Sequence, residues 1–176
     1  IYTRREVVDF ILDLAGYTID KPLHRLRILE PCFGDGDFLL TVVERLVTAY
    51  HTEKRPSAKA FSELQNALRA VELHEPTFQT TRSKLSNALT VAGFNEVKCK
   101  ALLDSWLING DFLLQPFDSG FAFVIGNPPY VRQELIPDAL LTEYRRRYVT
   151  IYDRADIYIP FIERSLSLLG LSLIHI

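Results

Sequence analysis

Apolar side chains recur along this chain at two spacings, which separate candidate helices from candidate strands. A spacing of three to four residues predicts amphipathic helices, whereas short continuous apolar runs rich in β-branched residues predict buried strands. The first pattern predicts a helix from about Thr3 to Gly16 and further helices at 37–50, 61–68, 75–91, 96–103, 138–148 and 155–169. The second pattern predicts strands at 26–29, 70–73, 106–108 and 121–125.

The order of these elements predicts the fold class. Strands that alternate with helices are typical of a mostly parallel α/β sheet with helices on both faces. Residues 170–176 are again largely apolar, so we expect another strand to start there. Thr3 followed by Glu6 fits a capping box at the start of the first helix. In such sheets ligands bind beyond the carboxyl ends of the strands, so we expect the functional residues directly after the predicted strands.

Composition narrows the classes of protein without identifying one. With 176 residues, 48% of them hydrophobic, the chain can bury one substantial core, and we treat 1–176 as a single domain. A net charge of −2 means that contact with nucleic acid must come from local patches. Charged residues interrupt every apolar run before membrane-spanning length, and the 2 cysteines and 4 histidines show no metal-ligand spacing. We expect a cytoplasmic protein with no metal site.

The turn after the first strand, Glu30 to Gly36, is a candidate ligand loop. Gly34 and Gly36 allow positive φ and a close approach of backbone to ligand, and Glu30 can accept hydrogen bonds from a ligand's ammonium group or from water. The pattern lacks the third glycine and the helix-opening geometry of a dinucleotide fingerprint. A plain tight turn after a strand is the structural alternative.

Two further strand ends carry acidic residues suited to a nucleoside. Glu72 can accept hydrogen bonds from both ribose hydroxyls, although a solvated surface carboxylate is the alternative. Asp111 can accept from the exocyclic amine of an adenine while the ring of Phe112 covers its face. A turn aspartate followed by a core phenylalanine explains that pair equally well.

The sharpest motif is Asn-Pro-Pro-Tyr at 127–130, directly after the strand at 121–125. Two prolines fix the backbone, so the Asn127 side chain and the Pro128 carbonyl can accept hydrogen bonds from one amino group. That geometry localises the lone pair of a planar amine such as adenine N6, which then attacks a sulfonium methyl in line. A structural turn or a polyproline ligand is the alternative.

The residues around this motif suit a nucleic-acid substrate. Tyr130 offers a flat face on which a base rotated out of the duplex can stack. Arg145–Arg147, with Arg132 and Arg154, could form a patch that faces phosphates. A solvated helix face is the alternative for this run of arginines.

Taken in order, these motifs resemble the N6-adenine DNA methyltransferases of restriction-modification systems. The resemblance covers nearly the whole chain, from 2–8, where Arg4 replaces the proline usual in the family, to the helix that follows Asp156. It implies a Rossmann-like methyltransferase fold, S-adenosylmethionine as cofactor and double-stranded DNA as substrate. The implied cofactor residues are Thr3, Glu30, Pro31, Gly34, Gly36, Glu72, Asp111 and Phe112; the catalytic residues are Asn127, Pro128 and Tyr130; and the substrate-binding residues are Pro129, Tyr130 and Arg132.

The resemblance also implies that this catalytic domain is incomplete. The later motifs of the family and its target recognition domain would follow Ile176, so we expect a C-terminally truncated domain that binds cofactor and methylates poorly. Two rivals remain, a methyltransferase acting on a protein glutamine amide and a non-catalytic specificity subunit. The helical opening motif and Glu30-Pro31 favour DNA over protein. An endonuclease in the same chain or in a partner subunit is compatible with the resemblance, although these residues carry no nuclease motif.

Overall fold

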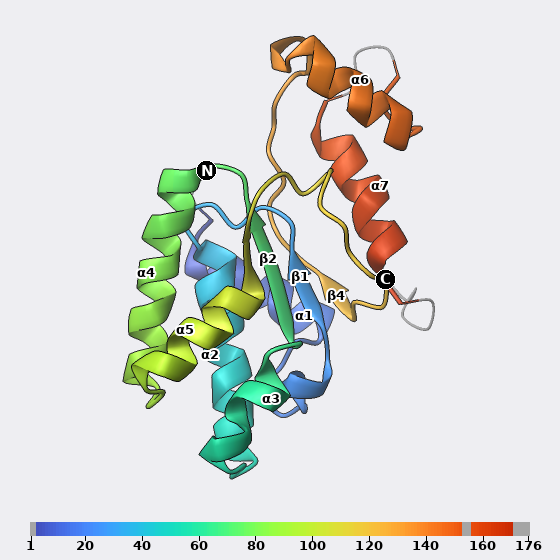
Figure 1. The fold of residues 1–176 in the computed structure, drawn as a ribbon. Coiled ribbons are helices and arrows are strands. Elements are labelled where there is room, and N and C mark those ends of the chain that lie inside the picture. Colours follow the sequence, from blue (N-terminus) through green and yellow to red (C-terminus); the bar gives the residue numbers. More distant parts are fainter. Residues whose placement is uncertain (1–2, 153–155, 171–176) are drawn as a thin grey trace.

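The computed structural model describes residues 3–152 and 156–170, and its centre is one parallel sheet (Figure 1). The strands are β1 Ile28–Glu30, β2 Leu68–Glu72, β3 Leu107–Asn109 and β4 Phe123–Val124, in the order β3-β2-β1-β4. Ile28 lies opposite Leu68 on one side and Phe123 on the other. The pairings between these four strands are all parallel, as the alternating pattern predicts.

Helices cover both faces of this sheet, which confirms the predicted layering. They are α1 Arg5–Ala15, α2 Asp37–Thr52, α3 Ala60–Leu64, α4 Glu75–Val91, α5 Glu96–Trp106, α6 Asp138–Arg147 and α7 Tyr158–Leu168, with short 3-10 turns η1 Leu23–Arg25, η2 Ser57–Lys59 and η3 Gln133–Leu135. Within the described ranges no helix is both long and apolar enough to cross a membrane.

The two faces of the sheet bury separate hydrophobic clusters. On one face Ile28 and Leu68 pack with the apolar sides of α1 to α5. On the other, Leu29 and Val71 pack with α6, α7 and the segment that follows β3. Neighbouring residues of a strand point to opposite faces, so β1 contributes Ile28 to the first cluster and Leu29 to the second. In Figure 1 α6 and α7 form a group of their own on the side away from α4 and α5.

Several predicted boundaries are wrong, among them those of β1, expected at 26–29, and β2, expected at 70–73. The N-cap of α1 is Arg4 and makes no side-chain cap bond, so the capping box through Thr3 does not form. The helix expected at 61–68 ends at Leu64, whose carbonyl accepts a 2.9 Å hydrogen bond from the indole of Trp106. Leu68 then begins β2 and is fully buried in the sheet. Trp106 itself ends α5, so β3 starts one residue later than expected.

The end of the described chain agrees with a further parallel strand. Only Phe123 and Val124 of the strand expected at 121–125 pair with β1, while Phe121 forms a parallel bridge with Leu169. The Gly170 amide donates to the Phe121 carbonyl at 3.0 Å. The helix expected from 155 begins at Tyr158. Residue 155 and positions 171–176, where the sequence predicts that strand, lie outside the described residues.

Candidate active site

The loops that follow β1, β2 and β4 meet at the carboxyl edge of the sheet, where they border a cavity of about 590 Å³. Parallel strands bring their carboxyl ends to the same edge, which is why motifs far apart in sequence converge here. Most of the predicted site residues line this cavity: Thr3, Glu30, Gly34, Glu72, Asn127, Pro128, Pro129 and Tyr130. The structure therefore brings these predicted residues together around one cavity, and their roles stay a prediction.

The loop after β1 is fixed by hydrogen bonds from two other elements. The Gly34 amide donates to Oε2 of Glu72 at 2.8 Å, and the Thr81 hydroxyl of α4 donates to the Gly34 carbonyl at 2.8 Å. One turn further along α4, Lys84 Nζ donates to the Asp35 carbonyl at 2.9 Å. These bonds hold the backbone in one conformation before any ligand arrives.

Gly36 joins this loop to the start of α2. It is the N-cap of α2, with φ of 89°, and Asp37 is the first helical residue. A Cβ at Gly36 would come within 2.7 Å of Thr81 Cγ2, so both conformation and space require glycine. The loop leads directly into the helix expected from Asp37, although it lacks the third glycine of a dinucleotide fingerprint.

Asp37 belongs to the site although the sequence analysis gave it no role. It lines the cavity, and its Oδ2 accepts a 2.6 Å hydrogen bond from the Thr3 amide. This bond fastens the N-terminal segment over the cavity and explains why Thr3 lies there without capping α1. The signal in the sequence was its position in the first turn of the predicted helix 37–50.

The charge of the cavity selects for a cationic ligand. Glu30, Asp35, Asp37 and Glu72 line it, and the described lining includes no Lys or Arg. Carboxylates attract a cation and repel a pyrophosphate, so this loop does not suit a dinucleotide. A ligand that carries an ammonium and a sulfonium group, as S-adenosylmethionine does, fits this charge.

Glu30 provides the most direct evidence for such a ligand. The residue is 2% exposed, and its Oε2 has no hydrogen-bond partner among the described residues. Burial, with the nearby Asp37 and Glu72 carboxylates, raises the pKa of Glu30 well above its usual value. A buried acceptor without a partner is costly, and an ammonium group would satisfy it.

Glu72 is buried and hydrogen-bonded, so the solvated alternative does not describe it. It is 7% exposed, and its Oε1 accepts from the His74 amide at 2.8 Å, while Oε2 accepts from Gly34. Oε2 also accepts a long contact from the Cys32 thiol at 3.9 Å, so the remaining capacity for ribose hydroxyls lies mainly on Oε1. His74, to which the sequence analysis gave no role, also lines the cavity.

Cys32, the cysteine in the described lining of the cavity, is not activated as a nucleophile. Burial and the neighbouring Glu72 raise the pKa of the Cys32 thiol to about 12, so it stays protonated at neutral pH. No set of three or more His, Cys, Asp or Glu side chains in the described part of the chain is arranged to hold a metal ion.

The loop after β4 presents its polar groups without internal partners. Asn127 is half-buried, and no hydrogen bond joins its side chain to any described residue. Tyr130 is 65% exposed, and its ring centroid lies 5.7 Å from that of Tyr158. The Asn127 amide oxygen is thus an available acceptor at the cavity wall, next to an exposed aromatic ring.

Five predicted site residues lie outside the lining of this cavity. Pro31 lines a smaller cavity of about 200 Å³ between the β4 loop and α7, and Gly36 contacts Thr81 instead. Phe112 is 2% exposed, and its ring centroid lies 5.0 Å from that of Phe161, which places the Phe112 ring in the core. The remaining two are Asp111, which bonds to α6, and Arg132, which is exposed.

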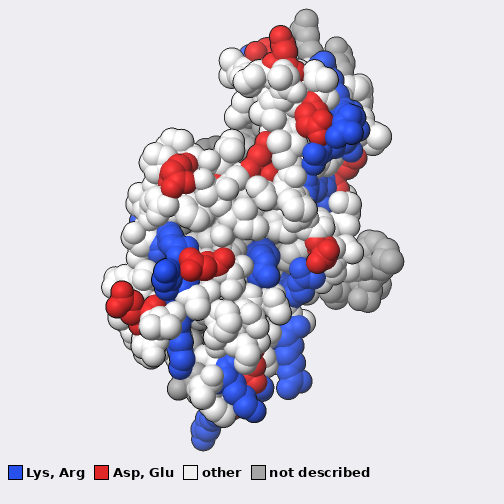
Figure 2. All heavy atoms as spheres, viewed as in Figure 1, with Lys and Arg blue, Asp and Glu red and all other residues white. Residues whose placement is uncertain are grey.

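The arginine run on α6 is partly neutralised within the helix. Arg146 and Arg147 both pair with Glu143, at 2.8 and 2.6 Å, and Arg145 donates to Gln133 at 3.2 Å. Figure 2 shows blue and red side chains side by side over this helix. Arg154, the last member of the predicted patch, lies outside the described residues.

Comparison with known proteins assigns the chain to a family. The model of the Eco57I restriction-modification methylase family matches residues 39–175. Three type II methyltransferases are similar over 97% of this chain: M.PaeR7I of Pseudomonas aeruginosa at 58% identity, M.XhoI of Xanthomonas vasicola at 48% and M.BstVI of Geobacillus stearothermophilus at 46%. The chain spans 29% of the length of the first and 31% of the other two.

A solved structure supports the fold independently. A putative class I S-adenosylmethionine-dependent methyltransferase from Listeria monocytogenes matches with a TM-score of 0.51, over 92% of this chain and 42% of its own, at 13% identity. This likeness shows the fold and confirms the Rossmann-like methyltransferase architecture. S-adenosylmethionine is the cofactor of the matched methylase family, which confirms the expected cofactor at that level. By these matches the chain belongs to the Eco57I restriction-modification methylase family.

Proposed function

We propose that this chain carries the transfer site of an enzyme that methylates the N6 amino group of an adenine rotated out of sequence-specific DNA. The observation that carries the proposal is Asn127, whose side chain has no partner among the described residues beside an acidic cavity. An acceptor in that place suits a substrate amine brought next to a cationic methyl donor. The family membership and the three type II relatives support DNA as the substrate.

Three acidic side chains would bind the cofactor as hydrogen-bond acceptors. Glu30 would accept from the ammonium group and Glu72 from the ribose hydroxyls. Asp111 lies outside the cavity lining but close to Glu72 in the sheet, since the Gly110 amide donates to the Glu72 carbonyl, and it would accept from the exocyclic amine of an adenine that extends beyond the ribose. The 34–36 turn lets the backbone approach the ligand closely, and Thr3 closes the cavity from the side of Asp37. When bound, S-adenosylmethionine supplies an electrophilic sulfonium methyl.

The chain activates the substrate amine through two acceptors. Asn127 Oδ1 and the Pro128 carbonyl accept hydrogen bonds from the two N6 hydrogens, which weakens conjugation with the ring and makes the nitrogen lone pair available. As the bond from N6 to the methyl carbon forms, the bond from that carbon to the donor sulfur would break, and N6 would lose one proton to solvent. Because the prolines fix both acceptors beforehand, little reorganisation is needed during the reaction. Loss of one such acceptor should cost about 10²–10³-fold in rate.

Tyr130 and the basic residues would hold the DNA. The exposed Tyr130 ring stacks on the rotated base, a contact worth about 1–3 kcal/mol. Arg132 and the arginines of α6 face the phosphates, with Arg145 the least neutralised because its partner is the uncharged Gln133. The proposal places the enzyme in the cytoplasm, with an endonuclease in the same chain or in a partner subunit.

Transfer of labelled methyl groups tests this proposal. The complete protein should move label from S-adenosylmethionine to adenine in duplex DNA, and Asn127→Ala should reduce that transfer about 10²–10³-fold while cofactor still binds. Label recovered in protein glutamine would instead indicate an amide methyltransferase. Absence of transfer to either substrate, with intact cofactor binding, would indicate a non-catalytic specificity subunit.

A further inference from the structure

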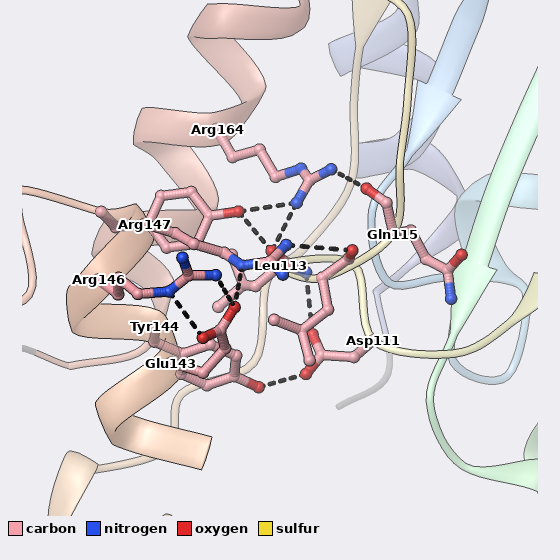
Figure 3. A network of polar contacts seen from close by, with 10 residues as sticks. Asp111, Leu113, Gln115, Glu143, Tyr144, Arg146, Arg147 and Arg164 are labelled. Carbon is pink, nitrogen blue, oxygen red and sulfur yellow. Dashed lines mark hydrogen bonds and ion pairs between the residues drawn. The ribbon is translucent and has the colours of Figure 1, made fainter. Parts of the chain in front are cut away.

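The carboxylate of Asp111 is held by a tyrosine from a distant helix (Figure 3). Its Oδ1 accepts from the Leu113 amide at 2.9 Å, and its Oδ2 accepts a short hydrogen bond from the hydroxyl of Tyr144. Tyr144 lies on α6, 33 residues further along the chain. The two bonds fix both oxygens of the side chain.

Tyr144 is well suited to be a permanent donor to this carboxylate. The residue is 4% exposed, and burial together with the hydrogen bond to Asp111 raises the pKa of its hydroxyl. The hydroxyl therefore keeps its proton over the whole physiological range. Hydrogen bonds from neutral donors to ionised acceptors are stronger than those between neutral groups, so the contact restricts rotation of the Asp111 side chain.

Other residues fasten the same segment without touching the carboxylate. The Tyr148 hydroxyl donates to the Leu113 carbonyl at 2.5 Å, and Arg164 of α7 donates to that carbonyl at 2.5 Å and to the Tyr148 hydroxyl at 2.7 Å. Arg147 reaches the Leu114 carbonyl at 3.3 Å. Backbone position is thus secured several times over, whereas among the described side chains Tyr144 is the one that orients the Asp111 carboxylate.

An ionised carboxylate offers about four acceptor positions, and the contacts to Leu113 and Tyr144 use two of them. We propose that Tyr144 is a positioning residue that aims the remaining acceptor positions of Asp111 at the exocyclic amine of the cofactor's adenine. This inference rests on the proposed role of Asp111 in cofactor binding. It predicts that a hydroxyl on α6 contributes to base selectivity at the cofactor site.

The experiment compares two ligands that differ in the base alone. Binding of S-adenosylhomocysteine and of its hypoxanthine counterpart, S-inosylhomocysteine, is measured by calorimetry on the complete protein. Hypoxanthine places a carbonyl oxygen where adenine carries the amine, and that oxygen would face the Asp111 carboxylate. The unaltered protein should therefore prefer the adenine ligand by at least about tenfold.

Tyr144→Phe keeps the buried ring and removes only the hydroxyl. We expect the preference for adenine to fall about fivefold or more, mainly through weaker binding of S-adenosylhomocysteine. Tyr148→Phe is the matched control, since it removes a hydroxyl from the same helix end that bonds to backbone instead. It should weaken both ligands equally, if at all, and leave the preference unchanged.

Asp111→Asn separates failure of this inference from failure of the proposed site. If Asp111→Asn lowers the preference and Tyr144→Phe does not, the positioning role is overturned while the adenine contact stands. An unchanged preference in Asp111→Asn would mean that Asp111 does not contact the base, which overturns both. Equal loss of affinity for the two ligands in Tyr144→Phe would reduce Tyr144 to a structural residue and likewise overturn the inference.

Discussion

The loops after β1 and β4 border the same cavity but are built in opposite ways. The β1 loop is fixed from outside by Glu72, Thr81 and Lys84, which bond to the backbone at Gly34 and Asp35. The β4 loop, at 127–130, instead leaves the Asn127 side chain without a partner among the described residues and the Tyr130 ring exposed. The backbone of the first loop is fixed by the chain alone, whereas the side chains of the second are arranged to be completed by a substrate.

This difference has a thermodynamic consequence. Buried polar groups are normally satisfied, and groups that are not indicate either a ligand or a cost in stability. In the β1 loop that cost is concentrated at one atom, Oε2 of Glu30. In the β4 loop the unpartnered groups are close to solvent, where water can satisfy them until DNA arrives. Substitutions in the first loop should therefore affect folding and cofactor affinity, and those in the second mainly the transfer rate.

The largest effect on stability should come from Gly36→Ala. Alanine is strained at φ of 89°, and its Cβ would come within 2.7 Å of Thr81 Cγ2, so we expect a loss of about 2–3 kcal/mol in unfolding free energy. Gly34→Ala is the control, because its φ is 50° and nothing lies within 4 Å of a Cβ there. It should cost only about 1 kcal/mol. Urea denaturation measures both, and equal losses would show that the Thr81 contact does not restrict this turn.

Tyr130→Ala should show the opposite pattern. The ring is 65% exposed, so unfolding free energy should change by less than about 0.5 kcal/mol. Loss of base stacking should lower DNA methylation by about tenfold or more, equivalent to roughly 1–3 kcal/mol. Tyr130→Phe, which keeps the flat ring, should retain most of the activity. A marked drop in melting temperature for Tyr130→Ala would contradict the contrast between the two loops.

The sequence predicts the fold better than it predicts the contacts between its elements. The alternation of strands and helices and the parallel pairing follow from local patterns, and these predictions are confirmed. The wrong predictions involve partners distant in sequence. An example is the indole of Trp106, which donates a hydrogen bond to the Leu64 carbonyl at the end of α3. The hydrogen bond from Tyr144 to Asp111 was beyond local pattern for the same reason, since it joins separate elements. The spacing of apolar residues predicts which side of a helix or strand is buried, but not which residues that side contacts.

Glu72→Gln should have an intermediate effect that tests the rigidity of the β1 loop. An amide keeps one acceptor but turns an NH₂ group towards one of the two backbone amides of Gly34 and His74. We expect a loss of about 1–2 kcal/mol in stability and roughly tenfold weaker binding of S-adenosylhomocysteine by calorimetry. Glu75→Gln, three residues away and exposed, should change neither. Unaltered affinity in Glu72→Gln would remove Glu72 from the cofactor site.

Glu30→Gln should change how the stability of the folded protein depends on pH, and not simply lower that stability. Burial first, then Asp37 and Glu72, raises the pKa of Glu30 in the folded protein above its ordinary 4.5. The folded protein therefore binds this proton more readily than the unfolded chain does. The corresponding stability is fully present below pH 4.5 and is lost as the pH rises through the folded-state pKa.

Removing this ionisation should flatten the decline in stability on the alkaline side of pH 4.5 in the ligand-free protein. Melting temperatures of Glu30→Gln and the unaltered protein across that range measure the difference. S-adenosylhomocysteine should counteract the decline in the unaltered protein, because its ammonium group stabilises the ionised Glu30, and should do so less in Glu30→Gln. Identical pH slopes without ligand would show that Glu30 titrates alike in both states. The unpartnered Glu30 oxygen would then not lower the stability of the folded protein, and the β1 and β4 loops would not differ in this respect.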